Sequence, residues 1–308
     1  MLIFIGLALC FFFVVAFSWV RRDFTEDEIN FTLRYLEMDS PFVVIDALRK
    51  EIWCLPIYFL FMWVWAKAFG LEFFVLLLPS LIATAIGIVF LALSQRNNLM
   101  RILVVLVCVL NPILYPVCAW MIRPYAFVFM FSCIAYFCFV RKWRICFIAS
   151  ISLLVLSHWC CVFLVAYYLG VEAIKTPRKI IQYIMPVGLF LIWFISVVAP
   201  QVWFVGSIMA GFGVEKPTIL GNIWLVWTLF SWFIILFGFG VWALCKRKEG
   251  FLPLACLAFW ALVILFSIIL PCSLFVLNYF APVFPFIFLI EAIGLYKIFS
   301  LTFPKHML

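Results

Sequence analysis

Charged residues are scarce in this sequence, and their scarcity limits what the protein can be. Only 11% of its 308 residues are charged, whereas 69% are hydrophobic. So little charge excludes an ordinary water-soluble domain, in which about a quarter of the residues are charged. Apolar runs of about 20 residues recur instead, the length that crosses the hydrocarbon core of a bilayer. We therefore predict an all-α, polytopic membrane protein with about 8–10 transmembrane helices in one membrane-embedded domain over residues 1–308.

Other features are missing as well. The first 20 residues lack a basic leader and a clean small-residue cleavage site, so we expect a retained first helix rather than a removable signal peptide. The sequence shows no internal repeat and no paired metal-ligand spacing, so it predicts no metal site and no cofactor, while leaving a divalent metal open. We interpret the cysteines within apolar runs as small packing residues: Cys108, Cys118, Cys133, Cys138, Cys146, Cys160, Cys161 and Cys256.

The net charge of +8 comes mostly from short basic clusters between apolar runs. Cytoplasmic loops of membrane proteins have an excess of Lys and Arg, which explains these clusters without a nucleic-acid partner. We therefore expect a cytoplasmic location for the clusters at 94–101, 141–144, 175–179 and 246–248. Arg123, the loop 200–222 and the break 272–278 would then face outward.

Acidic residues are concentrated in the first loop, since the segment from Arg21 to Glu51 holds eight of the thirteen. A capping-box spacing at Thr25 and Glu28 predicts one short amphipathic helix, and Ser40-Pro41 predicts the start of a second. The expected apolar faces are Ile29, Leu33 and Leu36 in the first helix and Phe42, Val43, Ile45 and Leu48 in the second. We expect both helices to lie on the membrane surface.

The acidic pair Asp27-Glu28 and two single polar residues each have two interpretations. Asp27 and Glu28 fit either a solvated helix face or a carboxylate that accepts a proton from an attacking hydroxyl. Arg123, just before Pro124, fits an interfacial anchor or a guanidinium that binds a phosphate. His158 lies in an apolar run and needs a partner, either as a buried packing residue or as part of a site.

The sequence allows two topologies for each of two apolar runs. Residues 145–170 form either a helical hairpin with His158 at its apex, which we favour, or one tilted span. Residues 52–69 are marginal for a span, because about 15 apolar residues are short for about 30 Å of hydrocarbon. Three full crossings would put Asp27 and Arg123 on opposite faces, so we predict that 52–69 is re-entrant or lies at the outer surface. The other runs lie near 73–93, 102–120, 124–140, 181–199, 223–244, 251–271 and 279–296.

Several short motifs follow one another along the chain. They are Asp27-Glu28, Pro56-Ile57-Tyr58-Phe59, Phe69-Gly70, Leu78-Pro79-Ser80, Arg123-Pro124-Tyr125, Ser157-His158-Trp159, and Asn278-Tyr279 followed by Pro282 and Pro285. Together and in this order they resemble the GT-C glycosyltransferases, in particular the dolichyl-phosphate-mannose protein mannosyltransferases and their bacterial relatives. Cys54 and Leu55 depart from the family's polar residue and first proline, and Asn278 replaces an arginine. Because the chain ends at Leu308, we expect it to lack the soluble carboxy-terminal domain of many relatives.

The resemblance implies transfer of a sugar from a polyprenyl or dolichyl phosphate to an acceptor hydroxyl of a glycan, lipid or protein. The active face would be periplasmic, extracellular or ER-lumenal. Asp27 would act as general base beside Glu28, and Arg123 would bind the donor phosphate and stabilise its growing charge. Supporting roles are implied for Tyr125, Arg21, Arg22 and Lys50 at the phosphate, and for His158, Asn278 and Tyr279 in orienting acceptor or phosphate.

Two other classes fit the same sequence. An integral-membrane polysaccharide polymerase of the O-antigen type also uses lipid-linked sugars, and its activity would depend on arginines in two large outer loops rather than on Asp27. A non-catalytic transporter or assembly subunit is the second class. Transport favours ionisable residues that face each other within spans, and here only His158 and Glu291 qualify.

Overall fold

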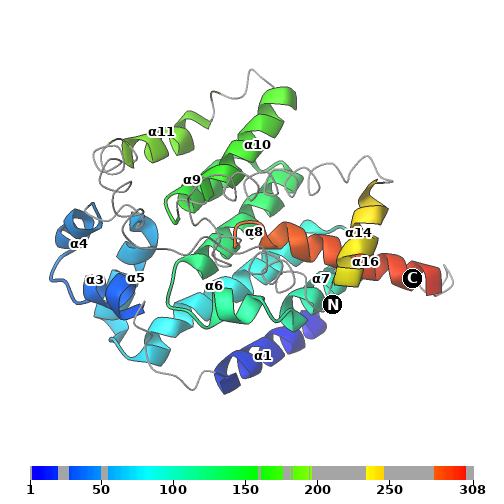
Figure 1. Cartoon of the computed structure of the whole chain (residues 1–308), viewed down its shortest axis with the longest axis horizontal. Helices are drawn as coiled ribbons and strands as arrows, with labels where there is room; N and C mark the ends of the chain where they lie inside the picture. Colours follow the sequence, from blue (N-terminus) through cyan, green and yellow to red (C-terminus); the bar gives the residue numbers. More distant parts are fainter. Residues whose placement is uncertain are drawn as a thin grey trace, which may run out of the picture.

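The computed structural model describes residues 2–19, 28–49, 55–158, 161–175, 181, 183–193, 195, 234–245 and 281–302. Within these ranges the chain is helical and contains no strand, which confirms the all-α prediction (Figure 1). The elements are α1 (Leu2–Trp19), η1 (Ile29–Leu33), α3 (Arg34–Leu36), α4 (Pro41–Leu48), α5 (Pro56–Phe69), α6 (Phe73–Ser94), α7 (Asn98–Leu110), η2 (Tyr115–Ala119), α8 (Tyr125–Arg141), α9 (Arg144–Val155), α10 (Cys161–Lys175), α11 (Ile184–Trp193), α14 (Ile234–Cys245) and α16 (Phe284–Thr302).

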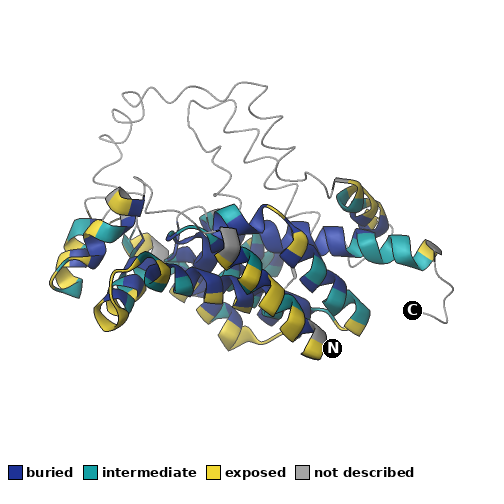
Figure 2. Ribbon diagram, turned by 90° about the horizontal axis from the view of Figure 1, so that it is seen from below, coloured by how far each residue is buried: buried dark blue, intermediate teal, exposed yellow. Residues whose placement is uncertain are grey.

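Two of the described helices are long and apolar enough to cross a membrane, namely α6 and residues Phe284–Leu301 of α16. Other apolar helical stretches have 10–17 residues, among them Ile5–Phe17 of α1 and Pro56–Phe69 of α5. The predicted loop 200–222, the run 251–271 and the break 272–278 lie outside the described residues. Figure 2 shows the buried residues concentrated in the central helices, with exposed residues frequent toward the edges.

α6 and α8 form the centre of the fold and pack along each other in the same direction. Near the start of α6, the Ser80 hydroxyl donates a hydrogen bond of 3.0 Å to the carbonyl of Met121. Near its end, Arg141 donates one of 2.8 Å to the carbonyl of Leu93. The helices approach closely between these points, where a Cβ added to Gly87 would meet the Phe129 ring at 2.7 Å.

This parallel arrangement gives the helices two distinct ends. At the first, here called the first-loop end, α1 finishes beside the start of α6, since the rings of Phe17 and Phe74 lie 6.4 Å apart. At the second, the basic end, α6 ends and α7 begins. Arg101 donates a hydrogen bond to the Gln95 carbonyl there. α7 and η2 then lead the chain back, so that Met121 again lies beside the start of α6.

The apolar run 102–120 is not one helix, contrary to the sequence prediction. α7 ends at Leu110 because Pro112 cannot donate the next helical hydrogen bond. The Asn111 side chain instead accepts a hydrogen bond of 3.1 Å from the backbone N–H of Ile113. A short π-helical turn, η2, follows from Tyr115 to Ala119. The Asn-Pro dipeptide was the sequence signal for this break.

The run 145–170 is a hairpin, as predicted. α9 ends at Val155 and α10 starts at Cys161, which leaves His158 at the apex. The rings of Phe147 and Tyr168 lie 5.2 Å apart although they are on opposite arms at nearly equal distances from His158. This contact requires the two arms to fold back along each other.

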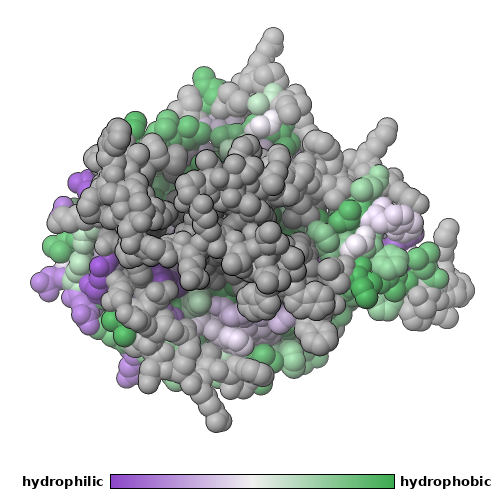
Figure 3. Space-filling model, in the orientation of Figure 1, coloured by the Kyte–Doolittle hydropathy of each residue, from purple (hydrophilic) through white to green (hydrophobic). Residues whose placement is uncertain are grey.

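The described part of the first loop is helical where the sequence predicted helices, but the predicted apolar face was only partly right in each. In the first helix Leu36 is buried whereas Ile29 is exposed, and the predicted start at Thr25 lies outside the described residues. α4 begins at Pro41, and the Ser40 hydroxyl caps it by accepting a hydrogen bond of 3.3 Å from the N–H of Val43. Val44 and Leu48 are buried in α4, whereas Val43 and the preceding Phe42 are exposed, so the predicted apolar face was only partly right. In Figure 3 the most hydrophilic surface lies over the side where Figure 1 places α3 and α4.

α5 packs against the first-loop helices α3 and α4. The indole N–H groups of two of its tryptophans donate hydrogen bonds to neighbouring segments. Trp63 donates a hydrogen bond of 2.8 Å to the carbonyl of Met38. Trp65 donates one of 2.9 Å to the carbonyl of Val75, which Pro79 leaves without its usual helical donor in α6. α5 ends at Phe69, and the φ of 104° at the following Gly70 suits a residue without a Cβ.

The packing interpretation of the cysteines holds for most of the described ones. Buried cysteines are Cys108, Cys118, Cys133, Cys138 and Cys161. Cys146 is exposed, so the interpretation is wrong there: it lies in the first turn of α9, whose neighbours Arg144 and Ile145 also face outward. Cys160 and Cys256 lie outside the described residues.

α16 joins the core through both apolar and polar contacts. Gly240 of α14 and Gly294 of α16 let these helices approach closely, since an added Cβ would overlap backbone atoms of the facing helix at either glycine. Glu291 is fully buried, and its Oε2 accepts a hydrogen bond of 3.2 Å from the Asn111 side chain. Glu291 Oε1 has no hydrogen-bond partner among the described residues.

Candidate functional site

The first loop meets the segment before Arg123 through a buried carboxylate. Glu28 is 1% exposed, and its Oε1 accepts a hydrogen bond of 2.9 Å from the backbone N–H of Ile122. Thr32, one helical turn later, donates 2.9 Å to the carbonyl of the same residue. Two side chains of the first loop therefore hold both polar groups of Ile122, which fixes the backbone immediately before Arg123.

α6 holds the same segment from its other side. The Ser80 hydroxyl donates to the carbonyl of Met121. The Thr84 hydroxyl shares its proton between the Ser80 carbonyl at 2.8 Å and the Cys118 carbonyl at 3.3 Å. Met121 and Cys118 precede a helix start, where the carbonyls of an irregular segment have no helical partner. Hydroxyls spaced four residues apart on one face of α6 provide those partners.

Arg123 is partly buried and lies just before the start of α8. No side chain caps that helix terminus by a hydrogen bond, and its first turn contains no acidic residue. The amino-terminal end of a helix attracts anions through its backbone N–H groups and its partial positive charge. Arg123 adds a full positive charge that carboxylates and phosphates bind through paired hydrogen bonds.

Tyr58 of α5 lies near both charged residues. Its side chain is fully buried, and its hydroxyl has no hydrogen-bond partner among the described residues. Burial raises the pKa of Tyr58 well above its usual value, while the nearby Arg123 lowers it and the nearby Glu28 raises it further. The Tyr58 hydroxyl therefore stays protonated at neutral pH and lies within electrostatic reach of both Arg123 and Glu28.

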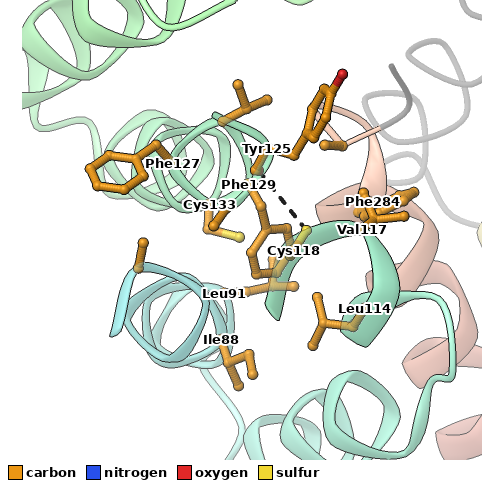
Figure 4. Packing of buried hydrophobic residues seen from close by; sticks show 14 of the residues in the cluster. Ile88, Leu91, Leu114, Val117, Cys118, Tyr125, Phe127, Phe129, Cys133 and Phe284 are labelled. Atoms are coloured by element: carbon orange, nitrogen blue, oxygen red, sulfur yellow. Dashed lines mark hydrogen bonds between the residues drawn. The ribbon is translucent and has the colours of Figure 1, made fainter. Parts of the chain in front are cut away.

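His158 reaches the same region from the apex of the α9–α10 hairpin. It is 5% exposed, and its ring lies 5.3 Å from that of Tyr125 in the first turn of α8. The backbone N–H of Ile57 donates a hydrogen bond of 3.3 Å to the carbonyl of Leu156, which ties the start of α5 to the hairpin. Figure 4 shows Tyr125 at the start of α8, with a weak hydrogen bond from Cys118 Sγ to its carbonyl.

No known family model, curated protein or solved structure matches this chain. The GT-C resemblance therefore remains a prediction drawn from short motifs. Within the described residues, no group of three or more His, Cys, Asp or Glu side chains has an arrangement that would hold a metal ion.

The structure brings together four residues that the sequence selected, namely Glu28, Arg123, Tyr125 and His158. The other selected residues lie outside the described ranges: Asp27, Arg21, Arg22, Lys50, Asn278 and Tyr279. Glu28 differs from a solvated helix residue, because it is buried and bonded to Ile122.

Sequence reasoning missed Tyr58 and the hydroxyls that hold the segment before Arg123. Tyr58 lies in the Pro-Ile-Tyr-Phe motif, which was noted for resemblance but given no role. Thr32, Ser80 and Thr84 are polar residues within apolar helical faces, which was the signal available for them. Their partners are backbone groups far along the chain, and no local pattern identifies those.

Proposed function

We propose that the chain is a multi-pass membrane glycosyltransferase that moves a sugar from a polyprenyl or dolichyl phosphate to an acceptor hydroxyl. The observation that supports this most strongly is the hydrogen bond between Glu28 and Ile122, which joins the acidic first loop to the segment of Arg123. The chemistry needs a carboxylate and a cation in one site, and this bond brings the described part of the acidic first loop next to the segment that carries Arg123.

In the proposed reaction, the acceptor oxygen attacks the anomeric carbon as the bond from that carbon to the donor phosphate oxygen breaks. A carboxylate takes the acceptor's proton, and Asp27 is the candidate for this role. The departing phosphate gains charge, which Arg123 and the start of α8 stabilise. Glu28 contributes by holding the backbone before Arg123 rather than by taking a proton, because its Oε1 already accepts from Ile122.

The proposed membrane placement puts the first-loop end outside. Arg101 and Arg141 lie at the opposite, basic end, which fits the excess of basic residues in cytoplasmic loops. α5 has 14 residues and is about 21 Å long, shorter than the roughly 30 Å hydrocarbon core, so it is proposed not to cross. Only α6 and the return through α7 and η2 then separate the first loop from Arg123, which supports one outer face for both.

A transfer assay with purified protein in detergent tests the proposal. A panel of lipid-phosphate sugars is offered with glycan and peptide acceptors, and wild type is compared with Asp27→Asn and Arg123→Ala. Wild type should transfer at least one sugar. Asp27→Asn should lose turnover while still binding donor, and Arg123→Ala should lose donor binding. Full turnover in both variants would refute the proposal.

A membrane polysaccharide polymerase is the second candidate. It is favoured by the engagement of Glu28 in backbone contacts, which leaves Arg123 as the most prominent charged group of the described site. A polymerase would retain activity in Asp27→Asn and would lengthen a lipid-linked oligosaccharide. A glycosyltransferase would add one sugar to an acceptor. The length of the product therefore separates the two.

A further inference from the structure

The hydroxyl of Tyr58 lacks a hydrogen-bond partner among the described residues although the side chain is shielded from solvent. The side chain is fully buried, and its hydroxyl forms no hydrogen bond with a described residue. A buried polar group without a partner costs stability, and phenylalanine would fill the same space without that cost. The hydroxyl therefore forms no stabilising contact with the described part of the protein.

The ring of Tyr58 is held from several sides. Its centroid lies 5.3 Å from that of Phe59 and 5.4 Å from that of Phe127, both in edge-on geometry. The neighbouring Ile57 N–H is bonded to the carbonyl of Leu156. Since α5, α8 and the hairpin all contact this turn, the hydroxyl cannot easily rotate toward water. Its position is thus fixed in advance near Arg123.

We propose that the Tyr58 hydroxyl is a binding group for the lipid-linked donor and donates a hydrogen bond to an oxygen of the phosphate that Arg123 binds. The inference rests on the proposed function and adds one residue to its phosphate site. A phosphate oxygen is a strong acceptor and would satisfy the hydroxyl. Burial also keeps the hydroxyl protonated at neutral pH, since it raises the pKa of Tyr58 well above its usual value.

The test compares two tyrosine-to-phenylalanine variants of the full chain in detergent. Tyr58→Phe removes the hydroxyl beside Arg123. Tyr168→Phe is the matched control, because Tyr168 is equally buried but packs against Phe139 and Phe147. Binding of a polyprenyl monophosphate should weaken about 10-fold or more in Tyr58→Phe, as expected for loss of a hydrogen bond to a charged group. Tyr168→Phe should bind like wild type.

Inorganic phosphate serves as a competitor that carries the headgroup without the lipid. Its apparent affinity should fall in Tyr58→Phe by a similar factor. A loss confined to the lipid would place the contact on the tail and overturn the phosphate assignment.

Thermal unfolding in the absence of ligand tests the inference in a second way, because Tyr58→Phe should weaken binding without lowering the melting temperature. Tyr58→Phe should melt at the same temperature as wild type or higher, because no bond is lost. A lower melting temperature would mean that the hydroxyl has a structural partner, and would overturn the inference. Equal binding by Tyr58→Phe and wild type would overturn it while leaving the proposed function intact. Absence of polyprenyl phosphate binding in wild type would overturn the proposed function and the inference together.

Discussion

Glu28 and Ile122 are 94 positions apart in the sequence, yet the Glu28 carboxylate accepts a hydrogen bond of 2.9 Å from the Ile122 backbone N–H. Both residues are buried. The bond makes the first loop part of the support for Arg123, and it removes Glu28 from the set of solvated acids. A buried acceptor engaged in this way stabilises a position more readily than it takes a proton from a substrate.

Substitutions of Glu28 test whether this residue holds the backbone before Arg123 or acts as the catalytic base. Glu28→Gln keeps a carbonyl oxygen that can accept from Ile122, so it should retain most stability and most activity. Glu28→Ala leaves that N–H without its acceptor and should destabilise the protein by about 1–3 kcal/mol. Thermal unfolding and sugar transfer measure the two effects. Glu37→Ala, at an exposed position of the same loop, should change neither. Loss of transfer in a stable Glu28→Gln protein would instead make Glu28 the base.

Arg123 should contribute to ligand binding more than to folding. Arg123→Ala should weaken binding of a polyprenyl monophosphate about 10- to 100-fold, because a charged hydrogen-bond donor is lost. Arg96→Ala is the matched control, since Arg96 is exposed and lies between α6 and α7. If Arg123 is only an interfacial anchor, Arg123→Ala will lower thermal stability and leave phosphate binding unchanged.

The proposed topology places the first loop and Arg123 on one side of the membrane. In a background without native cysteines, cysteines at Glu37 and Arg123 should react with an impermeant thiol reagent from the same side. A cysteine at Arg96 should react from the opposite side, because α6 separates the two ends. Labelling of the Glu37 and Arg123 positions from opposite sides would contradict the topology and the enzyme model with it.

The closeness of α6 and α8 depends on Gly87. Gly87→Ala would bring a Cβ within 2.7 Å of the Phe129 ring, and it should destabilise the protein by about 1–3 kcal/mol through overpacking. Gly170→Ala is the control, because an added Cβ there meets nothing within 4 Å. That change should be neutral or stabilise by up to about 1 kcal/mol through helix propensity. Equal unfolding temperatures for the two variants would refute this packing argument.

Asn111 and Glu291 should be energetically coupled. Asn111→Ala removes the donor to Glu291 Oε2 and leaves a buried acid with fewer partners, so it should destabilise the protein by about 1–3 kcal/mol. In a Glu291→Leu background the same change should cost less, by about 1 kcal/mol in a double-mutant cycle. Equal costs in the two backgrounds would show that the hydrogen bond contributes nothing to stability.

Local patterns were sufficient for much of the secondary structure. Ser40-Pro41 predicted the start of α4, and the polar Ser157-His158 pair predicted the apex of the hairpin. Both signals act within a few residues, since a cap or a proline determines which backbone groups are left for bonding. The break at Asn111-Pro112 had an equally local signal but was overlooked within a strongly apolar run.

The sequence by itself determined that the protein is helical and apolar, and it selected Arg123, His158 and the acidic first loop as the polar features of interest. Only the tertiary structure decided that Glu28 is buried against Ile122 and that Tyr58 lies near Arg123. The physical reason is that these contacts join backbone and side-chain groups far apart along the chain. Which groups meet depends on the parallel packing of α6 and α8, and helical periodicity specifies a buried face without naming its partner.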